Sequence, residues 1–142
     1  MATDSTILAE PTLPRVVADV AALEELLARP SGAVTADLAK LDGDILVLGA
    51  GGKMGPTLAW MARRAAPDKR IVAVARFSEP GVREALERRG VETIPCDLCD
   101  RHAVARLPQI ANVVFMAGRK FGAEGDLPLT WAMNVNVPAV VA

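Results

Sequence analysis

The chain has 142 residues, of which 51% are hydrophobic, and its formal net charge is −1. This length fits one domain of about 100–150 residues with an apolar core. A charge so close to zero gives no overall attraction to nucleic acid or to an anionic membrane, and no apolar run approaches the roughly 18 residues of a membrane span. The first residues lack the basic and apolar segments of a signal peptide. We therefore expect a cytoplasmic protein with neither nucleic-acid nor membrane partners.

Residues 1–42 differ in pattern from the rest of the chain, and we assign them to an N-terminal tail and helical extension. Proline and small polar residues in 1–14 indicate a loose tail. Apolar residues at helical spacing from Val16 to Leu27 predict an amphipathic helix, whose apolar stripe suits core packing or a homodimer. Thr35 is the expected N-cap of a short second helix over 36–41.

From residue 43 onward, predicted strands alternate with predicted helices. Short apolar runs indicate parallel strands that are buried on both faces. The expected strands are 45–48, 70–75, 91–94 and 111–116, and the expected helices are 53–65, 80–89, 101–107 and a last one from 128 through 135. This order predicts an α/β fold in 43–142, a Rossmann-type doubly wound parallel sheet with right-handed crossovers.

A glycine-rich turn joins the first of these strands to the first of these helices. Gly49, Gly52 and Gly55 have the spacing G-x-x-G-x-x-G. Gly51 gives only a loose match to G-x-G-x-x-G, because Met54 stands where the third glycine would fall. Glycines let the backbone turn sharply and approach a bulky ligand, and the following helix N-terminus presents N–H groups to a pyrophosphate. The turn therefore predicts dinucleotide binding.

Further motifs follow the other predicted strands. These are Arg76-Phe77-Ser78, Cys96-Asp97-Leu98, the small-residue turn within 114–118, and an N-V-N sequence within 131–136. With the glycine spacing, they make 43–142 resemble the NAD(P)-dependent epimerase/dehydratase family, the extended short-chain dehydrogenase/reductases. The resemblance implies that the first motif selects the cofactor, that Asp97 and Leu98 face the adenine, and that Ala117 and Gly118 pass beside the cofactor.

The residue after the second strand indicates which dinucleotide is bound. Sites that prefer NAD place an acidic residue there for the ribose 2′-OH. Arg76 occupies this place, and its guanidinium would attract a 2′-phosphate, to which Ser78 adds a hydroxyl donor. We therefore predict NADP. NAD stays open if Arg76 stacks on the adenine or points to solvent, or if a longer strand makes Glu79 the ribose acceptor.

Basic residues near the predicted site are further candidates. Lys53 and Met54 lie in the glycine turn, and Lys53 either reaches a phosphate or is solvated; the Walker pattern of ATPases is absent. Arg119 and Lys120 follow the fourth strand, where doubly wound folds bind ligands. They would hold an anionic substrate or the cofactor pyrophosphate, or they are solvated loop charges.

Cys96, Cys99 and His102 form the pattern C-x-x-C-x-x-H. A zinc site needs four ligands, and the chain has no second Cys/His pair. Asp97 and Asp100 should raise the thiol pKa values, which disfavours a redox role. We predict two apolar thiols and no metal site.

Family members carry a catalytic Tyr-x-x-x-Lys and a Ser/Thr, whereas this chain has no tyrosine and ends inside its last predicted helix. We therefore expect the N-terminal cofactor-binding part of a longer oxidoreductase or epimerase that acts on a small-molecule substrate. It would contain no catalytic residue and be inactive alone. The alternatives are a non-catalytic NAD(P)-sensing module and a protein that binds S-adenosylmethionine or a nucleotide sugar.

Overall fold

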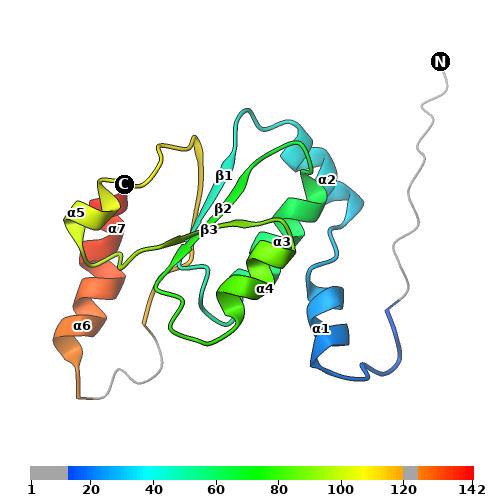
Figure 1. Cartoon of the computed structure of the whole chain (residues 1–142), viewed down its shortest axis with the longest axis horizontal. Helices are drawn as coiled ribbons and strands as arrows, with labels where there is room; N and C mark the ends of the chain where they lie inside the picture. Colours follow the sequence, from blue (N-terminus) through cyan, green and yellow to red (C-terminus); the bar gives the residue numbers. More distant parts are fainter. Residues whose placement is uncertain (1–12, 120–124) are drawn as a thin grey trace.

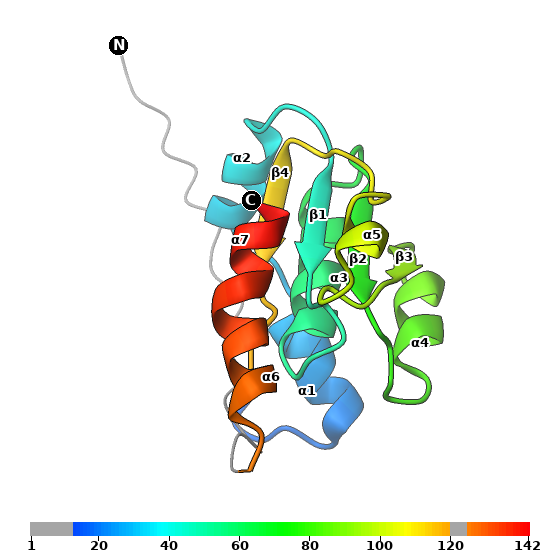
Figure 2. The same cartoon turned by 90° about the vertical axis from the view of Figure 1, so that its left-hand side faces the viewer.

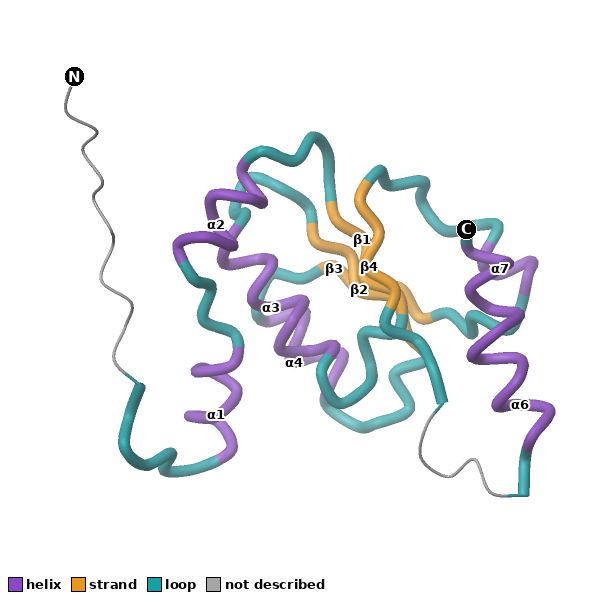
Figure 3. Tube along the Cα trace, turned by 180° about the vertical axis from the view of Figure 1, so that it is seen from behind, coloured by secondary structure: helices purple, strands orange, loops and turns teal. Residues whose placement is uncertain are grey.

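Four parallel strands form the centre of the computed structural model, which describes residues 13–119 and 125–142. They are β1 (Ile45–Leu48), β2 (Ile71–Ala75), β3 (Glu92–Pro95) and β4 (Asn112–Phe115), in the sheet order β3-β2-β1-β4. In register, Ile45 pairs with Ile71 on one side and with Asn112 on the other. Because all strands run the same way, the loops that follow them leave from the same end of the sheet (Figure 3).

Helices cover both faces of this sheet (Figures 1 and 2). On one side lie α1 (Val20–Leu27), α2 (Gly32–Ala39), α3 (Gly55–Ala65) and α4 (Val82–Arg88), with α3 in contact with the other three. On the other side lie α5 (Arg101–Val104), α6 (Leu127–Trp131), a π-helical turn η1 (Ala132–Asn136) and α7 (Val137–Val141). The predicted α/β class with a parallel sheet is therefore confirmed, and the arrangement is compatible with a Rossmann-like fold.

The core consists of two apolar layers, one on each face of the sheet. Ile45 and Val47 of β1 pack with Leu86 of α4 on one face. Leu46 and Leu48 of β1 pack on the opposite face, in the layer that includes Val137 of α7. All residues of β1 and β2 are buried, which explains why these strands are continuous apolar runs rather than alternating ones.

The N-terminal helix starts later than its apolar spacing predicts. Helix α1 begins at Val20 rather than Val16, because the Asp19 carboxylate accepts a hydrogen bond from the Ala22 N–H at 2.7 Å and caps the helix there. The expected core packing of its apolar stripe is also wrong, since no large apolar residue of α1 is buried. Of the tail expected over 1–14, residues 1–12 lie outside the described part of the chain.

Other element boundaries differ from the prediction by a few residues. The N-cap of α2 is Ser31 and not Thr35, whose hydroxyl instead donates to the Ser31 carbonyl at 3.2 Å. Helix α4 starts after Gly81, which has a φ of +80°. The last predicted helix is three consecutive segments, because a π-helical turn separates α6 from α7. Within the described ranges, no helix combines the length and apolar composition that crossing a bilayer would require.

Candidate functional site

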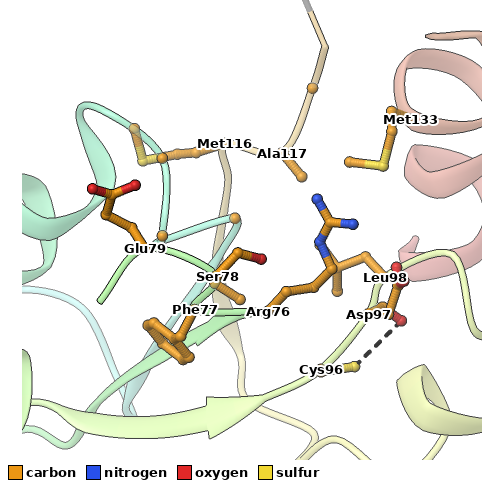
Figure 4. Close-up of a pocket in the computed structure, with 15 residues that line it drawn as sticks. Arg76, Phe77, Ser78, Glu79, Cys96, Asp97, Leu98, Met116, Ala117 and Met133 are labelled. Atoms are coloured by element: carbon orange, nitrogen blue, oxygen red, sulfur yellow. Dashed lines mark hydrogen bonds between the residues drawn. The ribbon is translucent and has the colours of Figure 1, made fainter. Parts of the chain in front are cut away.

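A cavity of about 330 Å³ lies at the carboxyl ends of the four strands (Figure 4). Ten of the fourteen predicted cofactor residues line it: Gly49, Gly51, Gly52, Arg76, Phe77, Ser78, Asp97, Leu98, Ala117 and Gly118. The cavity wall also contains five residues outside that set: Ala75, Glu79, Cys96, Met116 and Met133. Of these, only Glu79 is a candidate from the sequence, as the alternative ribose acceptor. Lys53, Met54, Gly55 and Arg119 are not part of the wall.

Two glycines of the turn are required by backbone packing. Gly49 has a φ of +86°, and a Cβ on it would lie 2.5 Å from the backbone nitrogen of Ala117. Gly55 begins α3 and is buried, and a Cβ on it would lie 2.6 Å from the Cα of Ala50. No side chain fits at either distance. Gly55 therefore sets how closely α3 approaches the turn, and it lies beneath the cavity wall rather than in it.

The other two glycines face the cavity. A Cβ on Gly51 would lie 3.0 Å from the Cβ of Ala75, whereas one on Gly52 would have only the Gly49 carbonyl oxygen nearby, at 3.6 Å. Gly52 is thus free of packing constraints, and its missing side chain leaves the cavity wall flat. The N-cap of α3, Met54, makes no side-chain capping hydrogen bond, and Lys53 and Met54 are both exposed.

The chain turns sharply where β2 ends. Phe77 has a φ of +51°, a left-handed conformation that is unusual for a bulky residue and costs of order 1–3 kcal/mol. Its ring is half-buried and packs against the core layer beneath α3. Figure 4 shows the ring on the side opposite Arg76, whose side chain extends into the cavity. The strained residue thus turns the chain so that Arg76 and Ser78 face the cavity.

Arg76 supplies the positive charge of the cavity. Its guanidinium lies near Ala117 and Leu98 (Figure 4), and among the described residues no hydrogen-bond or ion-pair partner of this side chain is found. Its charge lowers the pKa of the Cys99 thiol, against the larger effect of burial. Glu79 also lines the cavity, and its carboxylate points away from Arg76 (Figure 4). Because β2 ends at Ala75, the longer strand that would make Glu79 the ribose acceptor is not formed.

The segment after β3 is fixed by local hydrogen bonds. The Asp97 carboxylate accepts from the Cys99 N–H at 3.0 Å, and Leu98 is buried. Burial raises the pKa of both thiols, and the neighbouring aspartates raise them further. Asp100 caps α5, and the hydrogen bonds that its carboxylate accepts from the Ala103 and His102 N–H groups lower its pKa. The thiols are therefore protonated at neutral pH, and no group of three or more metal-ligating side chains occurs in the described part of the chain.

Asn134 of η1 holds the loop that follows β4. Its side-chain oxygen accepts from the Arg119 N–H at 2.7 Å, and its side-chain nitrogen donates to the Arg119 carbonyl at 2.8 Å. A Cβ on Gly118 would lie 3.2 Å from the Asn134 oxygen, so this close contact favours glycine. The Arg119 guanidinium forms an ion pair with Asp126 at 3.0 Å, outside the cavity wall. Lys120, predicted to act with Arg119, lies outside the described residues.

The wall of the cavity therefore combines three kinds of surface. Glycine backbone forms one side, the Arg76 guanidinium projects from a second, and the apolar side chains of Leu98, Met116 and Met133 form a third. Two acidic residues, Glu79 and Asp97, also line the cavity. Such a wall suits a ligand that has both a flat apolar group and an anionic group. No protein-family model and no curated protein were found to match this chain. The function is therefore inferred from the site itself.

Proposed function

We propose that this chain is a Rossmann-type NAD(P)-binding domain that holds NADP, from an oxidoreductase or epimerase similar to the extended short-chain dehydrogenase/reductases. The sheet order β3-β2-β1-β4 supports the proposal, because it equals the first four strands of the doubly wound order 3-2-1-4-5-6. In this order the chain runs outward from β1 to β3 and then returns to β4. Open parallel sheets bind ligands at the carboxyl ends of the strands beside such a reversal, and the cavity lies there.

The observation that carries the proposal is the position of Arg76 in this cavity. Its guanidinium enters from the end of β2, where doubly wound sheets bind the ribose next to the adenine. A cation here complements a 2′-phosphate, which NADP has and NAD lacks. Arginine binds phosphate through two parallel N–H donors, which makes the contact stronger than one with a neutral hydroxyl.

The remaining wall fits one nucleotide half of the cofactor. A volume of about 330 Å³ is at the lower end of the range for small-molecule pockets, which suits an adenosine moiety better than a whole dinucleotide. Leu98 and Met133 would flank the base, and the bare backbone of Gly51 and Gly52 would admit the pyrophosphate. When bound, the nicotinamide would supply hydride transfer.

We assign cofactor binding and no catalysis to these residues. A tyrosine would be needed for the proton transfer of the family's Tyr-x-x-x-Lys, and the chain contains none. The thiols nearest the cavity are protonated because burial raises their pKa values. The chain should therefore bind NADP without turning over a substrate.

Calorimetric titration with NADP and NAD tests the proposal. NADP should bind about 10- to 100-fold more tightly, because a hydrogen bond to a charged group contributes about 1.5–3 kcal/mol. Arg76→Asp should reverse the preference, whereas Arg88→Asp, an equal charge change on the exposed end of α4, should leave both affinities unchanged. Equal or tighter binding of NAD by the native chain would refute the choice of NADP.

A thermal-shift screen tests the ligand class independently, since a ligand that binds the native state raises the melting temperature. NADP should raise it more than S-adenosylmethionine or a nucleotide sugar. A shift with S-adenosylmethionine and none with NAD or NADP would overturn the assignment to a dinucleotide.

A further inference from the structure

Helix α1 is oriented with its charged residues toward the protein. The Glu24 carboxylate pairs with Arg89 at 2.8 Å, and the Glu25 carboxylate pairs with Arg64 at 2.8 Å. Both arginines also lie over the ring of Trp60 in α3, with the Arg89 guanidinium carbon 3.9 Å from the ring centre. The inner contact of α1 is thus a network of ion pairs and cation–π interactions.

Five large apolar residues of this segment are exposed to solvent. Figure 1 shows α1 outside α3, on the side away from the sheet. We define the outer stripe as five exposed residues, with these exposed fractions: Leu13 78%, Val16 79%, Val20 71%, Leu23 41% and Leu27 51%. An amphipathic surface helix normally has the opposite orientation, with its apolar side toward the core. The outer stripe is therefore a surface without a partner among the described residues of this chain.

We propose that the outer stripe is the contact between two copies of this chain. The stripe is uncharged, so it meets an identical stripe without electrostatic repulsion, as a two-fold symmetric contact requires. Val20, Leu23 and Leu27 lie on α1 at spacings of three and four, as in apolar helix seams that pair with each other, and Leu13 and Val16 extend the stripe in the segment before the helix. A partner with a charged binding surface would lose solvation on this stripe and gain no ion pair in return.

The area of the stripe is sufficient for a weak dimer. Five large apolar side chains that are 41–79% exposed form a patch of the order of 500 Å², near the upper limit for monomeric proteins. Two such patches in contact bury about 1,000 Å², the lower limit for a specific interface. We therefore expect a dimer that dissociates on dilution.

Sedimentation velocity over a concentration series tests this proposal. The native chain should convert from monomer to dimer as its concentration rises. The double variant Val20→Glu with Leu27→Glu should raise the dimer dissociation constant at least about tenfold, because it places charges in the contact. The matched control is Leu127→Glu on α6, which replaces a leucine of similar exposure, 67%, and should leave the dissociation constant unchanged.

The milder variant Leu27→Ser serves as a second measurement, since it removes apolar surface without adding charge. It should also weaken the dimer, with an unchanged circular dichroism spectrum. A chain that is monomeric at every concentration would overturn the proposal, as would a dimer that the stripe variants do not weaken. If the chain dimerises through α1 only after removal of residues 1–12, then these residues cover the outer stripe in the intact chain. That result would also overturn the proposal.

Discussion

Replacing Gly55 with alanine should destabilise the fold, although this position does not face the cavity. The new Cβ would lie 2.6 Å from the Cα of Ala50, whereas real carbon–carbon contacts need more than about 3.4 Å. Helix α3 would have to move away from the turn by roughly 1 Å. Overpacking of this kind costs about 1–3 kcal/mol and more where backbone opposes backbone. We expect a loss of about 3 kcal/mol in the free energy of unfolding.

Gly52→Ala is the matched control, because it makes the same chemical change three residues away. Its Cβ would meet only the Gly49 carbonyl oxygen, at an ordinary distance of 3.6 Å. Its effect on the free energy of unfolding should be within about 0.5–1 kcal/mol, and the smaller backbone entropy of the unfolded alanine chain can even make it stabilising. Because the new methyl group would project from the cavity wall, NADP binding should weaken while the fold is retained.

Urea denaturation followed by circular dichroism measures both effects, and calorimetry measures NADP affinity. The urea midpoint of unfolding should fall strongly for Gly55→Ala and stay nearly constant for Gly52→Ala. The affinity for NADP should show the opposite order, with the direct loss in Gly52→Ala. Equal midpoints for the two variants would refute the assignment of Gly55 to packing. Unchanged NADP affinity in Gly52→Ala would refute the assignment of Gly52 to the cofactor surface.

Three further predictions concern other contacts. Asp100→Asn should keep the α5 cap but make the free energy of unfolding fall less steeply at acid pH. Because the pKa of Asp100 is lowered in the folded state, its carboxylate stabilises the fold above its ordinary pKa of about 3.9. That stabilisation is lost as the pH falls through the folded-state pKa. Urea midpoints from neutral pH to pH 2 measure this, and an equally steep fall would contradict it. Trp60→Leu should speed hydrogen exchange in α1 and leave β1 unchanged, because it removes the ring beneath Arg89; equal exchange would show that α1 docks without the ring. Asn134→Leu should lower the free energy of unfolding by about 1–3 kcal/mol, since the Arg119 backbone loses both side-chain partners; an unchanged urea midpoint would argue against this.

The sheet could be predicted from the sequence because its strands are short apolar runs buried on both faces. Each of the four predicted strands is present, with ends shifted by at most one residue. Asp100 was also predictable as a cap, because its side chain bonds to the N–H groups of the following residues. Patterns of this kind involve only near neighbours in the chain.

Most of the cavity wall was predictable for a topological reason. Residues that follow parallel strands meet at one end of the sheet, so the motifs after β1, β2, β3 and β4 had to converge. Met133 could not be found in this way, because it comes from η1, and no local signal in the sequence indicates a π-helical turn. The role of Arg119 was missed for a similar reason: its partners Asp126 and Asn134 lie 7 and 15 residues further along the chain, beyond the reach of a local pattern.

The orientation of α1 was not predictable from its periodicity. Apolar spacing shows that a helix has an apolar side, but it does not show which side faces the protein. Here Arg64 of α3 and Arg89, which follows α4, bind the glutamates of α1, so the charged side faces inward. Only the positions of Arg64 and Arg89 in the folded chain decide this.

The packing of the glycine turn has a consequence for how this sequence can diverge. Gly49 and Gly55 are required by contacts with the backbone of Ala117 and Ala50, so selection for folding alone would retain them. Gly52 has no such constraint, and only a ligand against the cavity wall would keep it. A descendant that has lost the proposed cofactor should therefore still carry Gly49 and Gly55 but accumulate substitutions at position 52. That position, more than the complete glycine spacing, would distinguish relatives that bind a dinucleotide from relatives that keep only the fold.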